Sequence, residues 1–219
     1  MVARIDHITV IAPSLEVGAA YVEAALGVKP AAGRSHPSMA THNLLLALGN
    51  TVYLEIISTD PNAATVTRPR WFGLDGVLPG AAPRLAAWVA STDDIIGSVL
   101  PELGEVETMR RENHVWQMTL RADGSVPLDG AAPLLIQRAS GANPTAALPQ
   151  HGLQLKRLWL RHPHPARILT LLAKIGLDPQ PPITVGRGDA CSLLAEIQTP
   201  FGIKWLGEVW HRYPPSQQR

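Results

Sequence analysis

The sequence predicts an α+β fold in which one βα unit occurs three times. Each copy has a short apolar strand, a capping residue, a helix that ends at Leu-Gly or Ile-Gly, and further extended segments. Alternating apolar residues indicate strands, a 3.6-residue period indicates helices, and their recurrence indicates repeated structural units. The copies span about residues 1–60, 83–139 and 152–208. We expect a single domain over residues 1–212, with connecting loops at 61–82 and 139–151 and a tail at 213–219.

The first copy opens with the strand RIDHITVIA. Ser14 is a suitable N-cap and Gly27 a suitable residue after the helix, because Ser accepts free N–H groups and Gly tolerates a left-handed backbone. Between them, Leu15, Ala19, Val22 and Leu26 share one helix face. Strands are expected at 29–34, 40–47 and 51–58, and the turn Gly49-Asn50 makes the last two a hairpin. The first unit is therefore βαβββ.

The second and third copies repeat this order. In the second, a strand at 84–90 leads through the cap Thr92 to a helix at 93–103 that Pro101 interrupts near its end. Strands are expected near 105–110, 114–121 and 132–138. In the third, a strand at 155–161 leads to a helix from Pro165 to Lys174, and strands follow near 182–187, 191–198 and 202–207.

Composition limits the classes of function. The net charge is +1 and no run of basic residues is present, so we expect no nucleic-acid partner. The single cysteine, Cys191, excludes a disulfide within the chain. The apolar stretches are strand-sized, far below the roughly 20 residues that span a bilayer, so no membrane partner is expected. No signal peptide is evident, and we expect a cytoplasmic location.

Two polar residues of the first copy are candidates for chemistry. Alternation along the opening strand puts Ile5, His7, Thr9 and Ile11 on one face, away from the helix. The same argument puts Glu55 on that face. A His and a Glu on the concave side of a curved sheet could chelate a divalent metal, act as a base with its orienting acid, or form a structural hydrogen bond.

Further residues of the first copy add to this pair. His42 lies in the strand that pairs with the Glu55 strand, and we expect His7, His42 and Glu55 to line one cavity. His36 is expected to be exposed in a loop. The loop Pro61–Pro83 is either a lid or a surface crossover whose aromatics, Trp71 and Phe72, are buried in the core.

The segments DHITVIAPSLEVGAAYVEAALGV and GRSHPSMATHNLLLALGNTVYLEII resemble the opening of glyoxalase-like domain proteins of the vicinal oxygen chelate superfamily. The resemblance rests on Asp6-His7, the Pro-Ser-Leu-Glu helix start, His36-Pro37, Thr41-His42-Asn43 and Tyr53-Leu54-Glu55. PLLIQ at residues 133–137 is similar to the closing strand of a second unit. The resemblance covers the first sixty residues well and the remainder by its repeat pattern.

This resemblance implies paired βαβββ units that form a cup around a site for a small oxygenated substrate. It implies a divalent metal held by His7 and Glu55, acting as a Lewis acid in an isomerase, lyase or dioxygenase. Glu55 and His42 are the expected catalytic residues. In the second unit the opening ligand position falls near Leu85 and the closing one near Ile136 or Gln137. The substrate-binding set implied by the resemblance is His42, Asn43, Gln137 and Trp71.

A second class of function stays open, because at most three of the four usual ligands are present. In this alternative the cup binds or sequesters a small molecule without catalysis. A homodimer is compatible with either class. The third unit is expected to be structural, with Leu158 and Leu160 under the helix that carries Leu172. Its other face, with Arg157, Trp159 and Arg161, could instead attract an acidic ligand.

Overall fold

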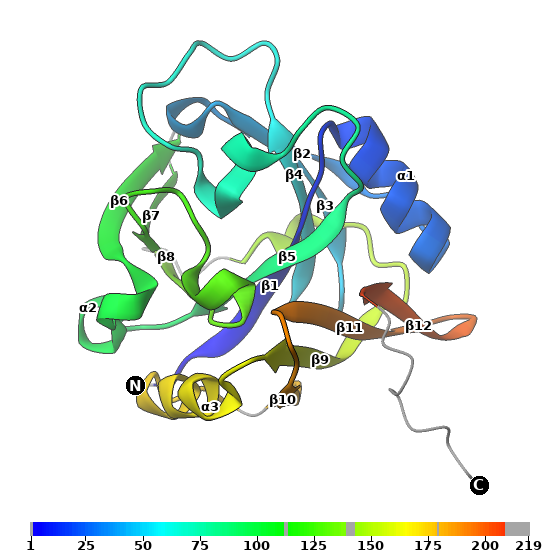
Figure 1. The fold of residues 1–219 in the computed structure, drawn as a ribbon. Helices are drawn as coiled ribbons and strands as arrows, with labels where there is room; N and C mark the ends of the chain where they lie inside the picture. Colours follow the sequence, from blue (N-terminus) through cyan, green and yellow to red (C-terminus); the bar gives the residue numbers. More distant parts are fainter. Residues whose placement is uncertain (1, 112–113, 139–142, 179, 209–219) are drawn as a thin grey trace, which may run out of the picture.

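The computed structural model describes residues 2–111, 114–138, 143–178 and 180–208. Within these ranges the strands form two sheets, one of eight strands in the order β2-β3-β4-β1-β5-β8-β7-β6 and one of four in the order β10-β9-β11-β12 (Figure 1). The strands are β1 (Arg4–Ile11), β2 (Ala31–His36), β3 (Thr41–Ala47), β4 (Tyr53–Thr59), β5 (Arg84–Ser91), β6 (Glu105–Arg111), β7 (His114–Leu120), β8 (Leu134–Arg138), β9 (Gln154–His162), β10 (Ile183–Arg187), β11 (Ser192–Thr199) and β12 (Gly202–Gly207).

The first helix forms as the sequence predicts. Helix α1 (Leu15–Leu26) begins after Ser14, whose side chain accepts the N–H of Val17 at 3.3 Å. It ends at Gly27, whose φ of 75° lies in the left-handed region that glycine adopts without strain. The strand β1 lies between β4, to which it is parallel, and β5, to which it is antiparallel.

The helix expected at residues 93–103 is wrong in length and in its cap. Helix α2 is only Ile95–Ser98, and a separate 3-10 turn, η3 (Pro101–Leu103), follows it. Asp94, rather than Thr92, caps α2 by accepting the N–H of Gly97 at 2.9 Å. Pro101 lacks an N–H and its ring clashes with the preceding turn, which is why the helix does not continue.

The third unit keeps the order of elements but pairs its strands differently. Helix α3 (Pro165–Lys174) has the predicted bounds and connects β9 to β10, which pair directly in parallel. In the first unit the strand parallel to β1 is β4, the last strand of the unit rather than the one after the helix. The outer strands β11 and β12 form an antiparallel hairpin on the other side of β9.

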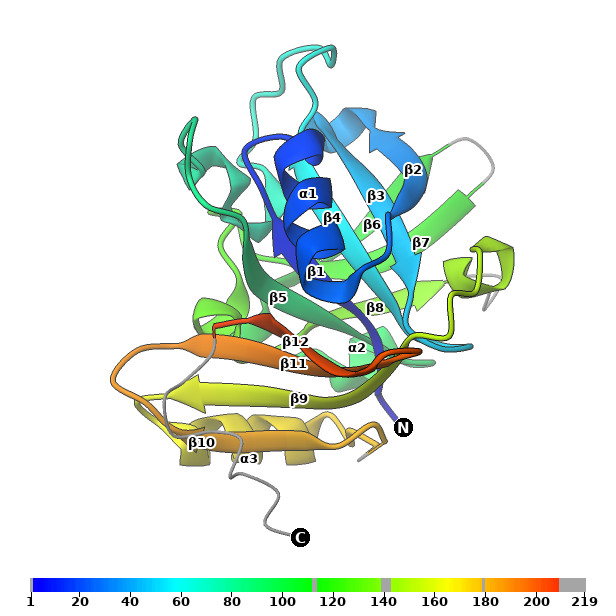
Figure 2. The ribbon, with the colours of Figure 1, turned by 90° about the vertical axis from the view of Figure 1, so that its right-hand side faces the viewer.

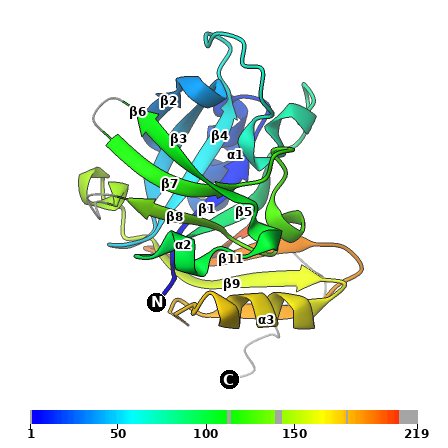
Figure 3. The same ribbon diagram turned by 90° about the vertical axis from the view of Figure 1, so that its left-hand side faces the viewer.

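The larger sheet curls so that its two halves face each other, with β2-β3-β4 opposite β6-β7-β8 (Figure 3). Helix α1 and the smaller sheet lie against its outer side (Figure 2). One apolar cluster joins this outer side to the third unit and includes Ile8, Val22, Leu158 and Leu172. A second cluster fills the inside with residues such as Ile57, Trp71 and Met118. No helix in the described ranges is long and apolar enough to cross a membrane.

Candidate functional site

A β-bulge in β1 places Asp6 and His7 on the same side of the sheet. The register with β5 shifts between Ile5, opposite Ala90, and His7, opposite Val89, so Asp6 is the extra residue. The expectation that Ile5 shares the face of His7 is therefore wrong, since Ile5 packs in the outer cluster with Ile8. A bulge leaves two successive side chains on one face, where regular pleating would separate them. Asp6 Oδ1 lies 2.7 Å from His7 Nδ1, and both residues are buried.

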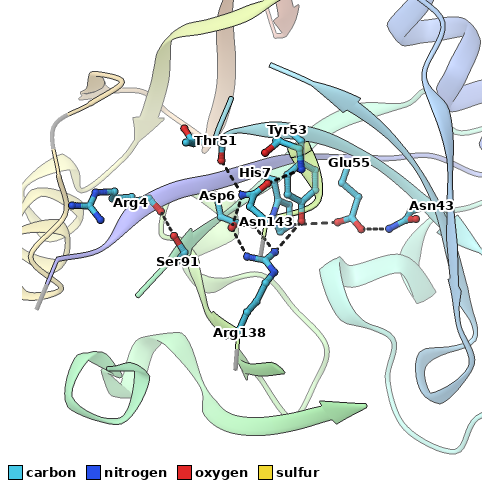
Figure 4. Close-up of polar contacts among 11 residues, drawn as sticks. Arg4, Asp6, His7, Asn43, Thr51, Tyr53, Glu55, Ser91, Arg138 and Asn143 are labelled. Carbon is cyan, nitrogen blue, oxygen red and sulfur yellow. Dashed lines mark hydrogen bonds and ion pairs between the residues drawn. The ribbon is translucent and has the colours of Figure 1, made fainter. Parts of the chain in front are cut away.

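Glu55 on β4 faces the other ring nitrogen of His7. Glu55 Oε2 is 3.5 Å from His7 Nε2, and Asn43 Nδ2 donates to Glu55 Oε1 at 2.6 Å (Figure 4). The expected shared face of His7 and Glu55 is thus confirmed. The result is a buried series of carboxylate, imidazole and carboxylate that lies on the inner side of the large sheet.

His42 does not belong to this group, and its expected place beside His7 and Glu55 is wrong. It precedes Asn43 in β3, so regular alternation directs the two side chains to opposite faces. His42 pairs with Ser58 on the outer face, near α1. There its charge adds to the lowering of the pKa of Glu16, which comes chiefly from hydrogen bonds of Glu16 with its own N–H and with Ser14.

His36, which the sequence predicts to be exposed, is instead a buried member of the site. Its Nε2 lies 3.1 Å from Asn43 Nδ2 and its Nδ1 3.3 Å from Arg111 Nη1. The ring of Trp71 meets it edge to face at 5.1 Å. Burial, with the nearby guanidinium of Arg111, lowers the pKa of His36 to about 4. His36 is missed from sequence because it ends a Gly- and Ser-containing strand just before Pro37, a context typical of a loop.

A second group of polar residues fixes Asp6. Arg138 on β8 donates to both Asp6 oxygens, at 2.5 and 2.8 Å, and its Nη2 is also 3.2 Å from Tyr53 Oη. Asn143 Nδ2 donates to Asp6 at 3.2 Å. The ring of Tyr53 stacks on His7 with centroids 4.5 Å apart. No local pattern marks Arg138 as a site residue, because its partner lies 132 residues away along the chain.

These contacts determine the charges of the site. Burial raises the pKa of Asp6, but hydrogen bonds and charges from His7 and Arg138 outweigh burial and leave that pKa far below its usual value. Burial alone would lower the pKa of His7, and the carboxylates of Asp6 and Glu55 raise it above its usual value. Glu55, buried but paired with His7, has a lowered pKa. Asp6 and Glu55 are therefore anionic around an imidazolium at neutral pH.

Residues 5–176 match the glyoxalase-like domain family. The chain belongs to this family. The match covers both halves of the large sheet and reaches the end of α3, so it includes the whole of the Asp6, His7 and Glu55 group. The expected resemblance to glyoxalase-like domains, and with it the α+β fold with curled mixed sheets, is confirmed.

Solved structures share this fold at low sequence identity. A hypothetical protein from Staphylococcus aureus matches with a TM-score of 0.59 and 15% identity, covering 87% of this chain and 88% of its own. A variant of the methylmalonyl-CoA epimerase from Streptomyces coelicolor, in complex with 2-nitronate-propionyl-CoA, matches with a TM-score of 0.42 and 16% identity over 62% of this chain and 97% of its own. The epimerase from Mycobacterium tuberculosis matches with a TM-score of 0.41 and 16% identity over 66% and 91%. None of the curated proteins compared with the chain matches it.

The second half of this glyoxalase-like cup presents no ligating side chain at the positions that match His7 and Glu55. In β5 the register shift leaves Ala86 as the extra residue and Ala87 opposite Thr9. Val89 then pairs with Leu134, as Thr9 pairs with Glu55 in the first half. Ala87 and Leu134, rather than positions near Leu85 and Ile136, are therefore the counterparts.

Gln137 does not face the site, and its expected role in substrate binding is wrong. Its Oε1 accepts the N–H of Ile95 at 2.8 Å and its Nε2 donates to the carbonyl of Asp93 at 2.8 Å. Both ends of the amide therefore hold the start of α2. The neighbouring Ile136 points into the cup instead, as alternation along β8 requires.

The segment after β4 covers the site from inside. The turn η2 (Trp71–Gly76) inserts Trp71, Phe72 and Leu74 into the inner cluster. Trp71 Nε1 donates to Thr41 Oγ1 at 3.1 Å. The loop is tied to β6 by Arg68, which donates to both Glu107 oxygens at 2.7 and 2.8 Å. Burial of its two aromatics confirms that part of the crossover interpretation, and opening as a lid stays a prediction.

The donor set does not fit a complete metal site. Among the described residues no group of three or more His, Cys, Asp or Glu side chains could hold a metal ion. His7 Nε2 and Glu55 are two donors, and Asp6 orients His7 through Nδ1 as carboxylates behind metal-bound histidines do. A structural divalent site normally takes four protein ligands and a catalytic one three, so these two alone fall short.

Proposed function

We propose that this glyoxalase-like protein is an enzyme that transfers a proton on a small oxygenated substrate, with His7 and Glu55 as acid and base. The observation that supports it most is the buried sequence of Asp6, His7 and Glu55, in which the imidazole lies between two carboxylates. Paired titratable groups whose environments shift their pKa values in opposite directions are typical of acid–base centres.

The chemistry follows from the charges. An imidazolium at His7 donates a hydrogen bond or proton to a substrate carbonyl oxygen. The Glu55 carboxylate accepts a proton from the adjacent carbon, which leaves an enol or enolate that His7 stabilises. Asn43 positions Glu55, and Arg138 keeps Asp6 ionised. Isomerases and lyases need this step, so they are the favoured reaction types.

Thr9 supports a polar ligand beside this pair. Its side chain lies on the inner face in register with Glu55, and its hydroxyl is buried without a hydrogen-bond partner among the described residues. A buried hydroxyl without a partner costs free energy, and a substrate oxygen at that position removes the cost. We propose that Trp71 and His36 line the entry side and that residues 61–82 move to admit substrate.

Solvent exchange tests the proposal with a panel of simple carbonyl compounds in place of the natural substrate. Small ketones, 2-hydroxy acids and acyl thioesters are incubated with the protein in D₂O, and exchange at the carbon next to the carbonyl is followed by NMR. His7→Gln and Glu55→Gln should each reduce exchange by at least about a hundredfold. His42→Gln, on the other face of β3, is the matched control and should retain it. Equal losses in all three variants would contradict the assignment.

A divalent metal on His7 and Glu55, and a non-catalytic binding role, are the alternatives. Metal content of the purified protein and of both Gln variants tests the first, and exchange that follows metal content rather than survives chelation would favour it. The apolar second half of the cup, with Ala87 and Leu134, favours the second. Saturable binding of a compound with no exchange, unchanged in Glu55→Gln, would support sequestration.

A further inference from the structure

A groove of about 540 Å³ lies between the first and third units, away from the His7 site. It is formed by the turn between β3 and β4, the start of β9, the segment before β10, and one residue of β11. Its lining is mostly polar, with three amides and three charged side chains: Asn50, Gln154, Gln180, Lys156, Arg157 and Glu196.

The third unit repeats at this groove the bulge that builds the His7 site. Between β9 and β11 the register shifts so that Arg157 is opposite Glu196 while Leu155 is opposite Ile197. Lys156 is therefore the extra residue, as Asp6 is in β1. Leu155 and Leu158 both pack in the outer apolar cluster, so Lys156 and Arg157 turn to the opposite face. Lys156 and Arg157 are thus the counterparts of Asp6 and His7.

The neighbouring strand extends the correspondence. Trp159, two residues after Arg157, pairs with Thr184 in the parallel strand β10, as Thr9 pairs with Glu55 in β4. Arg157 Nη1 donates to Thr184 Oγ1 at 2.9 Å. The guanidinium also lies over the ring of Trp159, 5.2 Å from its centroid. Arg157 is thereby held in one orientation before any ligand binds, which reduces the entropy lost on binding.

Among the residues that the structure describes, the two cations have no carboxylate partner. No ion pair in these ranges joins Lys156 or Arg157 to an acidic residue. Glu196 is opposite Arg157 across the strands but is not within ion-pair distance of it. Lys156 makes only a 3.5 Å contact with Gln154 Oε1.

We propose that this groove binds a small molecule through a carboxylate or phosphate group, held by Arg157 and Lys156. The planar guanidinium suits either oxyanion, since it can donate two parallel hydrogen bonds. The amides of Asn50, Gln154 and Gln180 supply further polar contacts around it. The proposal does not depend on acid–base chemistry at His7 and Glu55.

Glu196 gives the proposal a test of sign. Its carboxylate lines the same groove, so it repels a bound anion and lowers the affinity. Removing this charge by Glu196→Gln should therefore tighten anion binding, roughly threefold. Removing the cation by Arg157→Gln should weaken it by at least about tenfold.

Titration of the ¹⁵N-labelled protein with inorganic phosphate and with acetate, at constant ionic strength set by chloride, measures this by NMR. We expect saturable shifts at the amides of Asn50, Lys156, Arg157 and Thr184, with the two variants changing affinity in opposite directions. Phosphate alone, acetate alone or both giving this pattern tells which oxyanion is bound. Shifts that grow linearly, that lie elsewhere, or that are unchanged in Arg157→Gln would overturn the proposal. The spectrum of each variant without ligand shows that it is folded.

Discussion

At the scale of single residues, adjacent positions in a strand differ in function because of where the backbone turns them. Asp6 and His7 are neighbours on one face because a bulge interrupts the pleat. His42 and Asn43 are neighbours on opposite faces because β3 is regular between them. The site therefore takes both residues of the first pair and only Asn43 of the second.

The lowered pKa of His36 predicts a pH dependence of stability. The unfolded state, with a histidine pKa near 6.5, binds the proton before the folded state, whose pKa is about 4. Acidification from pH 6.5 towards 4 therefore destabilises the fold through this residue, by up to about 3 kcal/mol. His36→Gln should lose less stability over that window, measured as the free energy of unfolding in urea. His7, whose raised pKa has the opposite effect at higher pH, is common to both proteins. An identical pH dependence in the two would contradict the burial of a neutral His36.

At the scale of elements, local signals decide how well a helix follows its pattern. Helix α1 has a cap, an apolar face and a terminal glycine that agree, and its bounds match the prediction. The region after β5 has a proline at 101 and two glycines, at 97 and 104, and gives only one turn of α-helix. Gly18 in α1 has a different purpose, since it lets the helix approach β4 closely.

Substitution at Gly18 should therefore destabilise the protein although alanine favours helices. A Cβ at Gly18 would lie 2.4 Å from Ile56 Cγ2 and 2.9 Å from Ala12 Cβ. Gly18→Ala should cost about 1–3 kcal/mol through overpacking, measured by urea denaturation. Gly27→Ala is the control, because a Cβ there meets nothing within 4 Å and costs only the strain of a positive φ, about 1–2 kcal/mol. A more stable Gly18→Ala variant would mean that α1 can move away from the sheet.

At the scale of the whole molecule, the third unit is joined to the first through both backbone and core. Ala3 N–H donates to the carbonyl of Gly176 at 3.1 Å, and Leu155 N–H donates to that of Leu48 at 3.1 Å. Gly207 N–H donates to Tyr21 Oη at 3.2 Å, which joins β12 to α1. The outer apolar cluster runs without a break through these units. We therefore propose that the units form one cooperative domain.

Leu158→Ala tests this cooperativity. Leu158 is fully buried, so its truncation should cost about 2–5 kcal/mol. We expect the loss to appear in one transition, with tryptophan fluorescence and far-UV circular dichroism coinciding in urea. Leu169→Ala on α3, where the side chain is 54% exposed, should change stability by no more than about 0.5 kcal/mol. Two separate transitions would show that the third unit folds independently.

Features that depend on neighbouring residues could be predicted from the amino-acid sequence. Helix α1 with its caps, the hairpin around Gly49-Asn50 and the shared face of His7 and Glu55 follow from local periodicity and turn chemistry, which act over a few residues. Other features required the folded chain. The burial of His36, the clamp of Arg138 on Asp6 and the return of Gln137 to α2 depend on contacts between distant segments. The bulges of β1 and β9 likewise depend on register against a partner strand. Such contacts form only when strands far apart in the chain pair, and no short window of sequence records that pairing.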